Sequence, residues 1–133
     1  MFMGLLVLGL ASCTNDPVGR TSPVKGMVKG PDGQALKMGS VTFWPDKAKG
    51  NKSAFEAGSE IKEDGTYELF THGKKGVPPG LYIVTIISQT VPDSTQPTKS
   101  KNLVPEKYNS KEKTDLFVEV KDDSNVTYDL TAK

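Results

Sequence analysis

Short segments that alternate apolar and polar residues, separated by tight-turn signals, constrain the fold of this chain most. The turn signals are Pro31-Asp32-Gly33, Asp64-Gly65 and Pro79-Gly80, which are rich in residues that reverse a backbone. A period of two places alternate side chains on opposite faces of a strand, and no window sustains a helical period. The sequence therefore predicts an all-β fold, a sandwich or small barrel, with candidate strands at residues 24–28, 41–43, 55–61, 67–69, 81–87, 116–120 and 126–130.

One face of each candidate strand should pack into a shared core. We expect the apolar phase to supply that core through Val28, Val41, Phe43, Tyr67, Leu69, Tyr82, Val84, Val118, Tyr128 and Leu130. Residues 47–53 and 90–102 are polar, and the second stretch is rich in Pro, Ser, Thr and Lys, which predicts exposed loops. A single helical turn is expected near residues 104–107.

Composition narrows the range of functions. The length of 133 residues suits one domain, and a net charge of +1 provides no strong field for nucleic acid. Arg20 is the only arginine, although arginine is the usual residue for bidentate recognition of phosphate or carboxylate. Cys13 and His72 are the only cysteine and histidine, so neither an internal disulfide nor a structural zinc site of about four Cys and His ligands can form. We predict no cofactor and no nucleic-acid partner.

The first twelve residues, MFMGLLVLGLAS, carry no charged side chain and are mostly apolar. They are too few to span a bilayer, which takes roughly 20 residues, but they suit the apolar region of a secretory signal peptide. The segment ends in Leu10-Ala11-Ser12-Cys13, which resembles the bacterial lipobox. That resemblance implies that the Cys13 thiol receives a diacylglycerol and that cleavage makes Cys13 the first mature residue. Two alternatives are a buried N-terminal element with a packed cysteine and an uncleaved membrane anchor.

One departure from the lipobox pattern is that no Lys or Arg precedes the apolar segment. Residues 14–22 are polar and contain Pro and Gly, so they are expected to form a flexible tether after the lipidated Cys13. The nine residues of this tether reach at most about 30 Å. The predicted organisation is a signal peptide (1–12), the lipidated cysteine with this tether (13–22) and one domain (23–133). We expect a membrane-anchored protein of the cell envelope. Because Thr14 rather than Asp follows the cysteine, the related sorting pattern favours the outer membrane.

Several motifs of the domain occur in a characteristic order and spacing. They are Val24-Lys25-Gly26-Met27-Val28, Asp32-Gly33, Leu36, Val41, Phe43, Asp64-Gly65-Thr66-Tyr67 and Pro79-Gly80-Leu81-Tyr82-Ile83-Val84. Together they resemble carboxypeptidase regulatory-like domains. The tail, with Val104-Pro105-Glu106-Lys107-Tyr108 and Tyr128-Asp129-Leu130, is similar to small bacterial lipoproteins that carry this domain. The resemblance implies a transthyretin-like (prealbumin-like) fold, which is a seven-stranded Greek-key β-sandwich. It implies no reaction.

Catalytic chemistry finds little support in the sequence. Hydroxyisourate hydrolases of the same fold use several His and Arg residues and end in Tyr-Arg-Gly-Ser, whereas this chain ends in Leu-Thr-Ala-Lys. His72 precedes Gly73 in a polar stretch and is interpreted as a solvated loop residue. Isopeptide bonds of related domains need an inward lysine, but Lys25, Lys29 and Asp129 fall on the outward phase.

Two groups of acidic residues contain the carboxylate oxygens that calcium binds. Glu60-Glu63-Asp64 and Asp122-Asp123 have no recognisable ligand spacing and are interpreted as solvated turns. We therefore predict no metal site and no enzymatic activity.

Trp44 is the residue most suggestive of binding. It falls on the outward phase next to Val41 and Phe43, where an indole could stack on a sugar or a partner peptide. The alternative is that it packs on Pro45 or beneath a loop, and Ile83 and Ile87 share the same ambiguity.

The prediction from sequence is a non-catalytic, lipid-anchored envelope domain with a structural or binding role. A carbohydrate- or peptide-binding module of the cell surface is the alternative, and a hydrolase is the third hypothesis. The partners expected are the membrane, through the lipid anchor, and an envelope protein or glycan.

Overall fold

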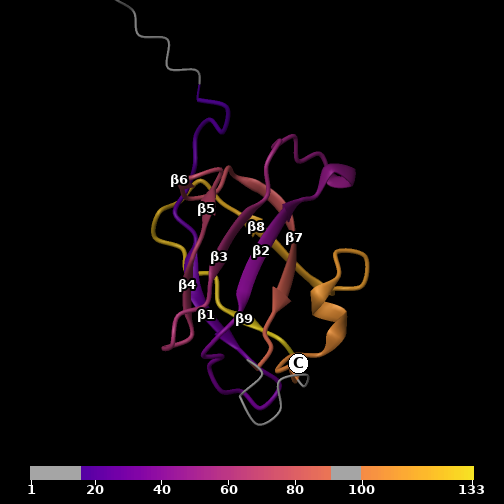
Figure 1. The fold of residues 1–133 in the computed structure, drawn as a ribbon. Helices are drawn as coiled ribbons and strands as arrows, with labels where there is room; N and C mark the ends of the chain where they lie inside the picture. The colour runs from indigo at the N-terminus through magenta and orange to yellow at the C-terminus, as the bar shows by residue number, and fades with distance from the viewer. Residues whose placement is uncertain (1–15, 91–99) are drawn as a thin grey trace, which may run out of the picture.

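The computed structural model describes residues 16–90 and 100–133, and these form two β-sheets with one shared core (Figure 1). Two 3₁₀ turns, η1 (Lys47–Lys49) and η2 (Glu106–Asn109), occur in this part of the chain, which contains no α-helix. The prediction of an all-β, sandwich-like fold is confirmed. The strands are β1 (Lys25–Lys29), β2 (Ser40–Pro45), β3 (Ala57–Glu60), β4 (Thr66–Glu68), β5 (Phe70–Thr71), β6 (Lys74–Lys75), β7 (Gly80–Ile87), β8 (Leu116–Val120) and β9 (Leu130–Thr131).

The larger sheet has the strand order β6-β5-β3-β2-β7-β8, and all its pairings are antiparallel. The smaller sheet has the order β4-β1-β9, with β1 antiparallel to β4 and parallel to β9. Residues 106–109 supply the helical turn expected near 104–107.

The chain passes from the smaller sheet to the larger one at Leu69. Its amide donates to the carbonyl of Val24 (2.9 Å), and its carbonyl accepts from the amide of Gly76 (2.9 Å). The single strand expected at 67–69 is therefore only β4, and β5 begins immediately after Leu69 in the other sheet.

A two-residue turn, His72-Gly73, joins β5 to β6. Both residues have positive φ, 47° at His72 and 80° at Gly73, which is the geometry of the tight hairpin turn that suits twisted strands. The sequence did not predict this hairpin, because its strands have two residues each and show no periodicity.

The core matches the sequence prediction except at one position. Val118 is half-buried and packs against the core, whereas the nine other expected residues are buried. The Phe43 ring contacts aromatic rings of both sheets, Tyr67 at 6.4 Å and Tyr82 at 5.9 Å between centroids. Such tilted pairs add to the burial of apolar area that holds two sheets together.

The C-terminal segment crosses β1 at Gly26. The amide of Tyr128 donates to the Lys25 carbonyl (2.9 Å), and the Tyr67 hydroxyl donates to the Tyr128 carbonyl (2.5 Å). A Cβ atom on Gly26 would lie 2.1 Å from that carbonyl oxygen, so only glycine allows the approach. The strand expected at 126–130 was wrong in extent, because the ladder with β1 begins only at Leu130.

Replacing Gly26 with Ala should therefore destabilise the domain. The added methyl group meets backbone rather than a movable side chain, and we expect a loss of about 1–3 kcal/mol in the free energy of unfolding. Gly58→Ala in β3 is the matched control, because its nearest contact would be 3.4 Å and alanine suits a strand better than glycine. Urea denaturation of both variants measures the difference, and equal stabilities would contradict this account of the crossing.

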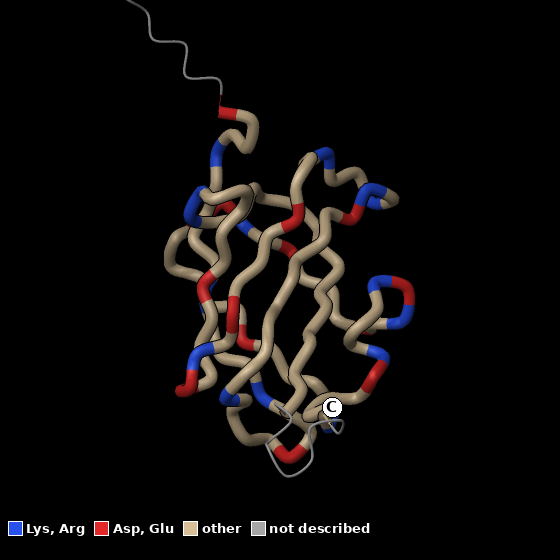
Figure 2. Tube along the Cα trace, viewed as in Figure 1, with Lys and Arg blue, Asp and Glu red and all other residues tan. Residues whose placement is uncertain are grey.

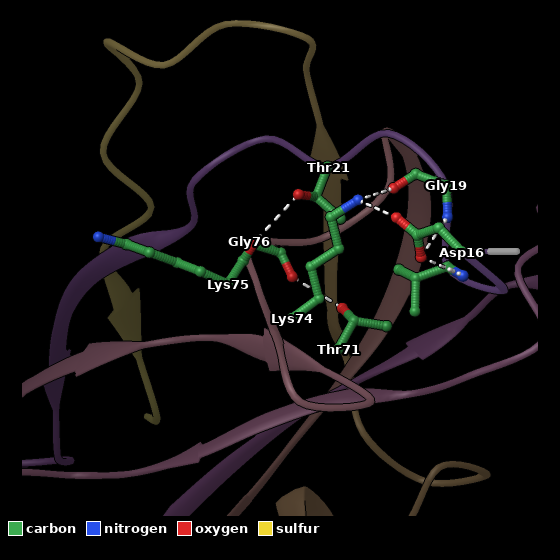
Figure 3. A network of polar contacts seen from close by, with 8 residues as sticks. Asp16, Gly19, Thr21, Thr71, Lys74, Lys75 and Gly76 are labelled. Atoms are coloured by element: carbon green, nitrogen blue, oxygen red, sulfur yellow. Dashed lines mark hydrogen bonds and ion pairs between the residues drawn. The ribbon is translucent and has the colours of Figure 1, made fainter. Parts of the chain in front are cut away.

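Residues 16–22, here called the N-terminal strap, lie against the β5–β6 hairpin (Figure 3). Ser22 and Val77 exchange two backbone hydrogen bonds (2.8 and 2.9 Å). The Lys74 ammonium reaches both the Asp16 carboxylate and the Gly19 carbonyl at 2.5 Å, and its hydrogen bond lowers the pKa of Asp16. These contacts were not predicted from the sequence, which suggested a tether over this range.

Candidate functional site

The outer face of the larger sheet carries a row of apolar side chains at neighbouring positions on three strands. Trp44 of β2 pairs with Ile83 of β7, which pairs in turn with Phe117 of β8. These three residues are called the aromatic row. Neighbouring strands lie about 4.8 Å apart, so the Cα atoms of Trp44 and Phe117 are roughly 10 Å apart. Trp44 and Ile83 are half-buried, while Phe117 is 56% exposed.

A hydrogen bond holds the Trp44 side chain in place. Its Nε1 donates to Oγ1 of Thr85 at 2.9 Å, and Thr85 follows Ile83 on the same face of β7. The indole therefore reaches from its own strand across to the next one, with its only polar atom satisfied. A ring anchored in this way loses little conformational entropy when a ligand stacks on it.

Two lysines cover the rings of the aromatic row. The Lys111 ammonium lies 4.7 Å from the Trp44 ring centroid, and the Lys49 ammonium lies 5.0 Å from that of Phe117. At exposed sites such cation–π contacts are worth only about 0.5–1 kcal/mol, so a ligand can displace them at small cost. Within residues 16–90 and 100–133, neither ammonium forms an ion pair.

The surface beside Trp44 is hollowed into a groove of about 580 Å³. Here this hollow is called the Trp44 groove. Its floor is aromatic and aliphatic, and its rim carries both charge signs. The Ser110 hydroxyl donates to Glu112 at 2.9 Å and lowers the pKa of that rim carboxylate, which stays ionised. The lining residues are Trp44, Pro45, Lys47, Ala54, Glu56, Ile83, Lys111 and Glu112.

The surroundings of Trp44 have features of both interpretations. The indole is on the outward phase, as expected, but it is half-buried and shares its groove with Pro45. Ile83 belongs to the same groove, whereas Ile87 is 46% exposed and stands four residues further along β7. The arrangement can hold a flat or apolar group against the indole and place lysine and glutamate at its edges.

Two members of this site were missed from the sequence. Phe117 stands between Leu116 and Val118, on the phase that an alternating strand usually gives to polar residues, and that mismatch was the available signal. Lys111 had no signal, because only the folded chain brings it over Trp44.

The other sequence candidates do not gather into a site. Cys13 lies outside the described residues. His72 is exposed in the hairpin turn, where its ring stacks on Phe55 with 4.2 Å between centroids. Lys25, Lys29 and Asp129 are exposed, as their outward phase predicts.

The acidic turns are exposed as well. Asp64 accepts hydrogen bonds from the amide and hydroxyl of Thr66 (3.0 and 2.6 Å), which lower its pKa, and Asp122 pairs with Arg20. Throughout the part of the chain that the structure describes, no three His, Cys, Asp or Glu residues group as metal ligands. The same part contains no helix long and apolar enough to cross a membrane.

Comparison with protein-family models, with curated proteins and with solved structures finds no match to this chain. Its function is therefore argued from its own residues.

Replacing Thr85 with Val should release the indole, because valine keeps the shape of threonine and removes the oxygen that Trp44 Nε1 needs. We expect a loss of about 0.5–1.5 kcal/mol in stability and easier quenching of Trp44 fluorescence by acrylamide. Trp44 is the only tryptophan, so the emission reports this site alone. Thr42→Val, paired with Thr85 on the same face, is the control and should leave the quenching unchanged. Identical quenching in both variants would disprove the anchoring role.

Proposed function

We propose that this chain is a non-catalytic binding domain, held at the cell envelope by a lipid on Cys13, with the Trp44 groove as its ligand site. The observation that carries the binding role is the anchored indole of Trp44 in the same row as the exposed ring of Phe117. A monomeric surface that served packing alone would have no use for an aromatic ring fixed by hydrogen bonding and covered only by a displaceable ammonium.

The transthyretin-like topology is part of this proposal. When the β5–β6 hairpin at the edge of the larger sheet is set aside, seven described strands remain, three in the smaller sheet and four in the larger one. The chain changes sheets between β1 and β2, and again between β3 and β4, as Greek-key connections do. This arrangement supports the resemblance to carboxypeptidase regulatory-like domains.

The absence of catalysis is proposed from the positions of the reactive side chains. His72 occupies a turn position and stacks on Phe55, and no carboxylate hydrogen-bonds to its ring among the described residues. The carboxylates with shifted pKa values, such as Asp64 and Asp115, have lowered values because hydrogen bonds stabilise their charge. Groups of this kind remain ionised near neutral pH and are poor general acids.

A ligand with a ring that stacks on the indole fits the Trp44 groove, and a saccharide is the first choice. Sugar rings offer an apolar face to the aromatic ring and hydroxyl groups to Lys47, Glu56 and Glu112 at the rim. A peptide with an aromatic or proline side chain is the alternative occupant.

Ligand binding should change the fluorescence of Trp44. Titration with a panel of envelope oligosaccharides and peptides is expected to give saturable quenching or a blue shift for one of the two classes. In a direct assay such as calorimetry, Trp44→Ala should weaken binding by about tenfold or more, which is the usual effect of removing an aromatic anchor. Phe70→Ala is the control, because Phe70 is 46% exposed on β5 of the same sheet, away from the groove. Binding that survives Trp44→Ala would exclude this groove as the ligand site.

Lipidation is tested separately. Protein purified from envelope membranes of a bacterial host should begin at Cys13 and carry the mass of a diacylglycerol, and Cys13→Ser should abolish the modification. Thr14→Ser retains the lipobox and is the matched control. Fractionation is expected to place the wild-type protein in the outer membrane. An unmodified, soluble wild-type protein would refute the anchor.

A further inference from the structure

The N-terminal strap shortens the connection between Cys13 and the folded domain. Asp16 is bound to Lys74, so only three residue steps separate the cysteine from a fixed point of the domain. Three steps span about 10 Å at most, whereas the nine-residue tether expected from the sequence would span about 30 Å.

The strap is fastened at several points along its length. Ser22 is paired with Val77, the Thr21 hydroxyl donates to the Lys75 carbonyl at 2.9 Å, and Arg20 forms an ion pair with Asp122 (Figure 3 shows the Thr21 and Asp16 contacts). This end of the sandwich, opposite the C-terminus in Figure 1, is here called the strap end. A lipid on Cys13 holds the strap end close to the membrane surface.

Three lysines with no ion pair stand at the strap end. Lys47, Lys49 and Lys52 are exposed and pair with no carboxylate in the described residues, whereas Arg20, Lys74 and Lys75 at the same end are each paired. The two acidic residues of the same loop are Asp46, which is buried, and Glu56, which is exposed, so the three lysines exceed the exposed acidic residues of the loop by two. Figure 2 shows the basic residues on the outermost part of this loop.

A second hollow, of about 480 Å³, lies between the strap and this lysine loop. Pro17 and Val18 of the strap form one side, Lys49 and Lys52 form another, and Pro79 and Leu81 complete it. Apolar walls with two lysine residues at one edge suit a phosphate that carries glycerol and the first part of an acyl chain. The hollow is here called the strap groove.

We propose that the strap end rests on the membrane and that the strap groove and its lysines bind anionic phospholipid headgroups. The inference rests on the proposed lipid anchor and adds a fixed orientation. Electrostatic attraction acts over about 8–10 Å at physiological ionic strength, which matches the reach that the strap leaves between Cys13 and the domain. Lysines at that distance are attracted to an anionic membrane surface. Lysines that form ion pairs with carboxylates are attracted much less, because their charge is already neutralised.

The experiment uses the lipidated full-length protein in vesicles, with its acyl mass checked first. Ala48→Cys places a fluorophore between Lys47 and Lys49, and Gln34→Cys places one in the exposed turn after β1, at the far end of the domain. Quenchers attached to lipid headgroups report proximity to the membrane. Vesicles contain phosphatidylcholine alone or mixed with phosphatidylglycerol.

We expect strong quenching of the label at position 48 in phosphatidylglycerol vesicles and little at position 34. That quenching should be lost in 0.5 M salt, because salt shortens the distance over which charges attract. It should also be lost in a variant with Lys47, Lys49 and Lys52 all changed to Gln. Changing Lys29, Lys37 and Lys62 to Gln, at the far end, should have no effect. Inorganic phosphate at an ionic strength matched with chloride should not displace the domain, since the headgroups are held at high local density.

Two results would overturn the proposal. Equal quenching at positions 48 and 34 in the phosphatidylglycerol vesicles would mean that the domain has no fixed orientation. Displacement by inorganic phosphate beyond the chloride control would mean that the groove recognises the free anion instead of the membrane. If no lipidated protein can be obtained, the proposed function fails as well, and the acyl mass shows this before vesicles are added.

Discussion

The contact of the C-terminal segment with β1 at Gly26 is the constraint on which the rest of this structure depends. It places the Tyr128 carbonyl within reach of the Tyr67 hydroxyl, and it brings β9 alongside β1 in parallel. The smaller sheet consists of β4, β1 and β9, so it exists only because residues distant in sequence meet there. Burial raises the pKa of the Tyr67 phenol above its ordinary value, so the hydroxyl keeps its proton and donates at this crossing in alkaline solution as well as at neutral pH.

The larger sheet depends on the smaller one through Phe43. Its ring extends from β2 of the larger sheet and meets Tyr67 of the smaller sheet and Tyr82 of the neighbouring strand β7, so one aromatic side chain joins the two layers. With Phe43 directed inward, alternation turns Trp44 outward, where Thr85 holds it. The same strand thus provides the centre of the core and the floor of the Trp44 groove, which is why the groove has a rigid base.

The sequence predicted those features that follow from the alternation of side chains along one strand. The inward phase of Val41 and Phe43 and the outward phase of Trp44, Lys25 and Asp129 are examples. It did not predict the change of sheet at Leu69, because that change depends on the carbonyl of Val24 and the amide of Gly76. The contact of Lys111 with Trp44 and that of Asp16 with Lys74 were missed for the same reason. Each of them joins residues that are more than fifty positions apart in the sequence.

The strap also determines how the domain carries mechanical load. With the proposed lipid on Cys13 in a membrane and a ligand in the Trp44 groove, movement of that ligand would pull on the chain through residues 16–22. Ser22 and Val77 form an isolated pair, so tension falls on two backbone hydrogen bonds before it reaches any ladder of the sheets. The exposed ion pairs of Asp16 and Arg20 are the weakest of these contacts, so they would break first. Release of the strap would then lengthen the connection by several residues while both sheets stay intact.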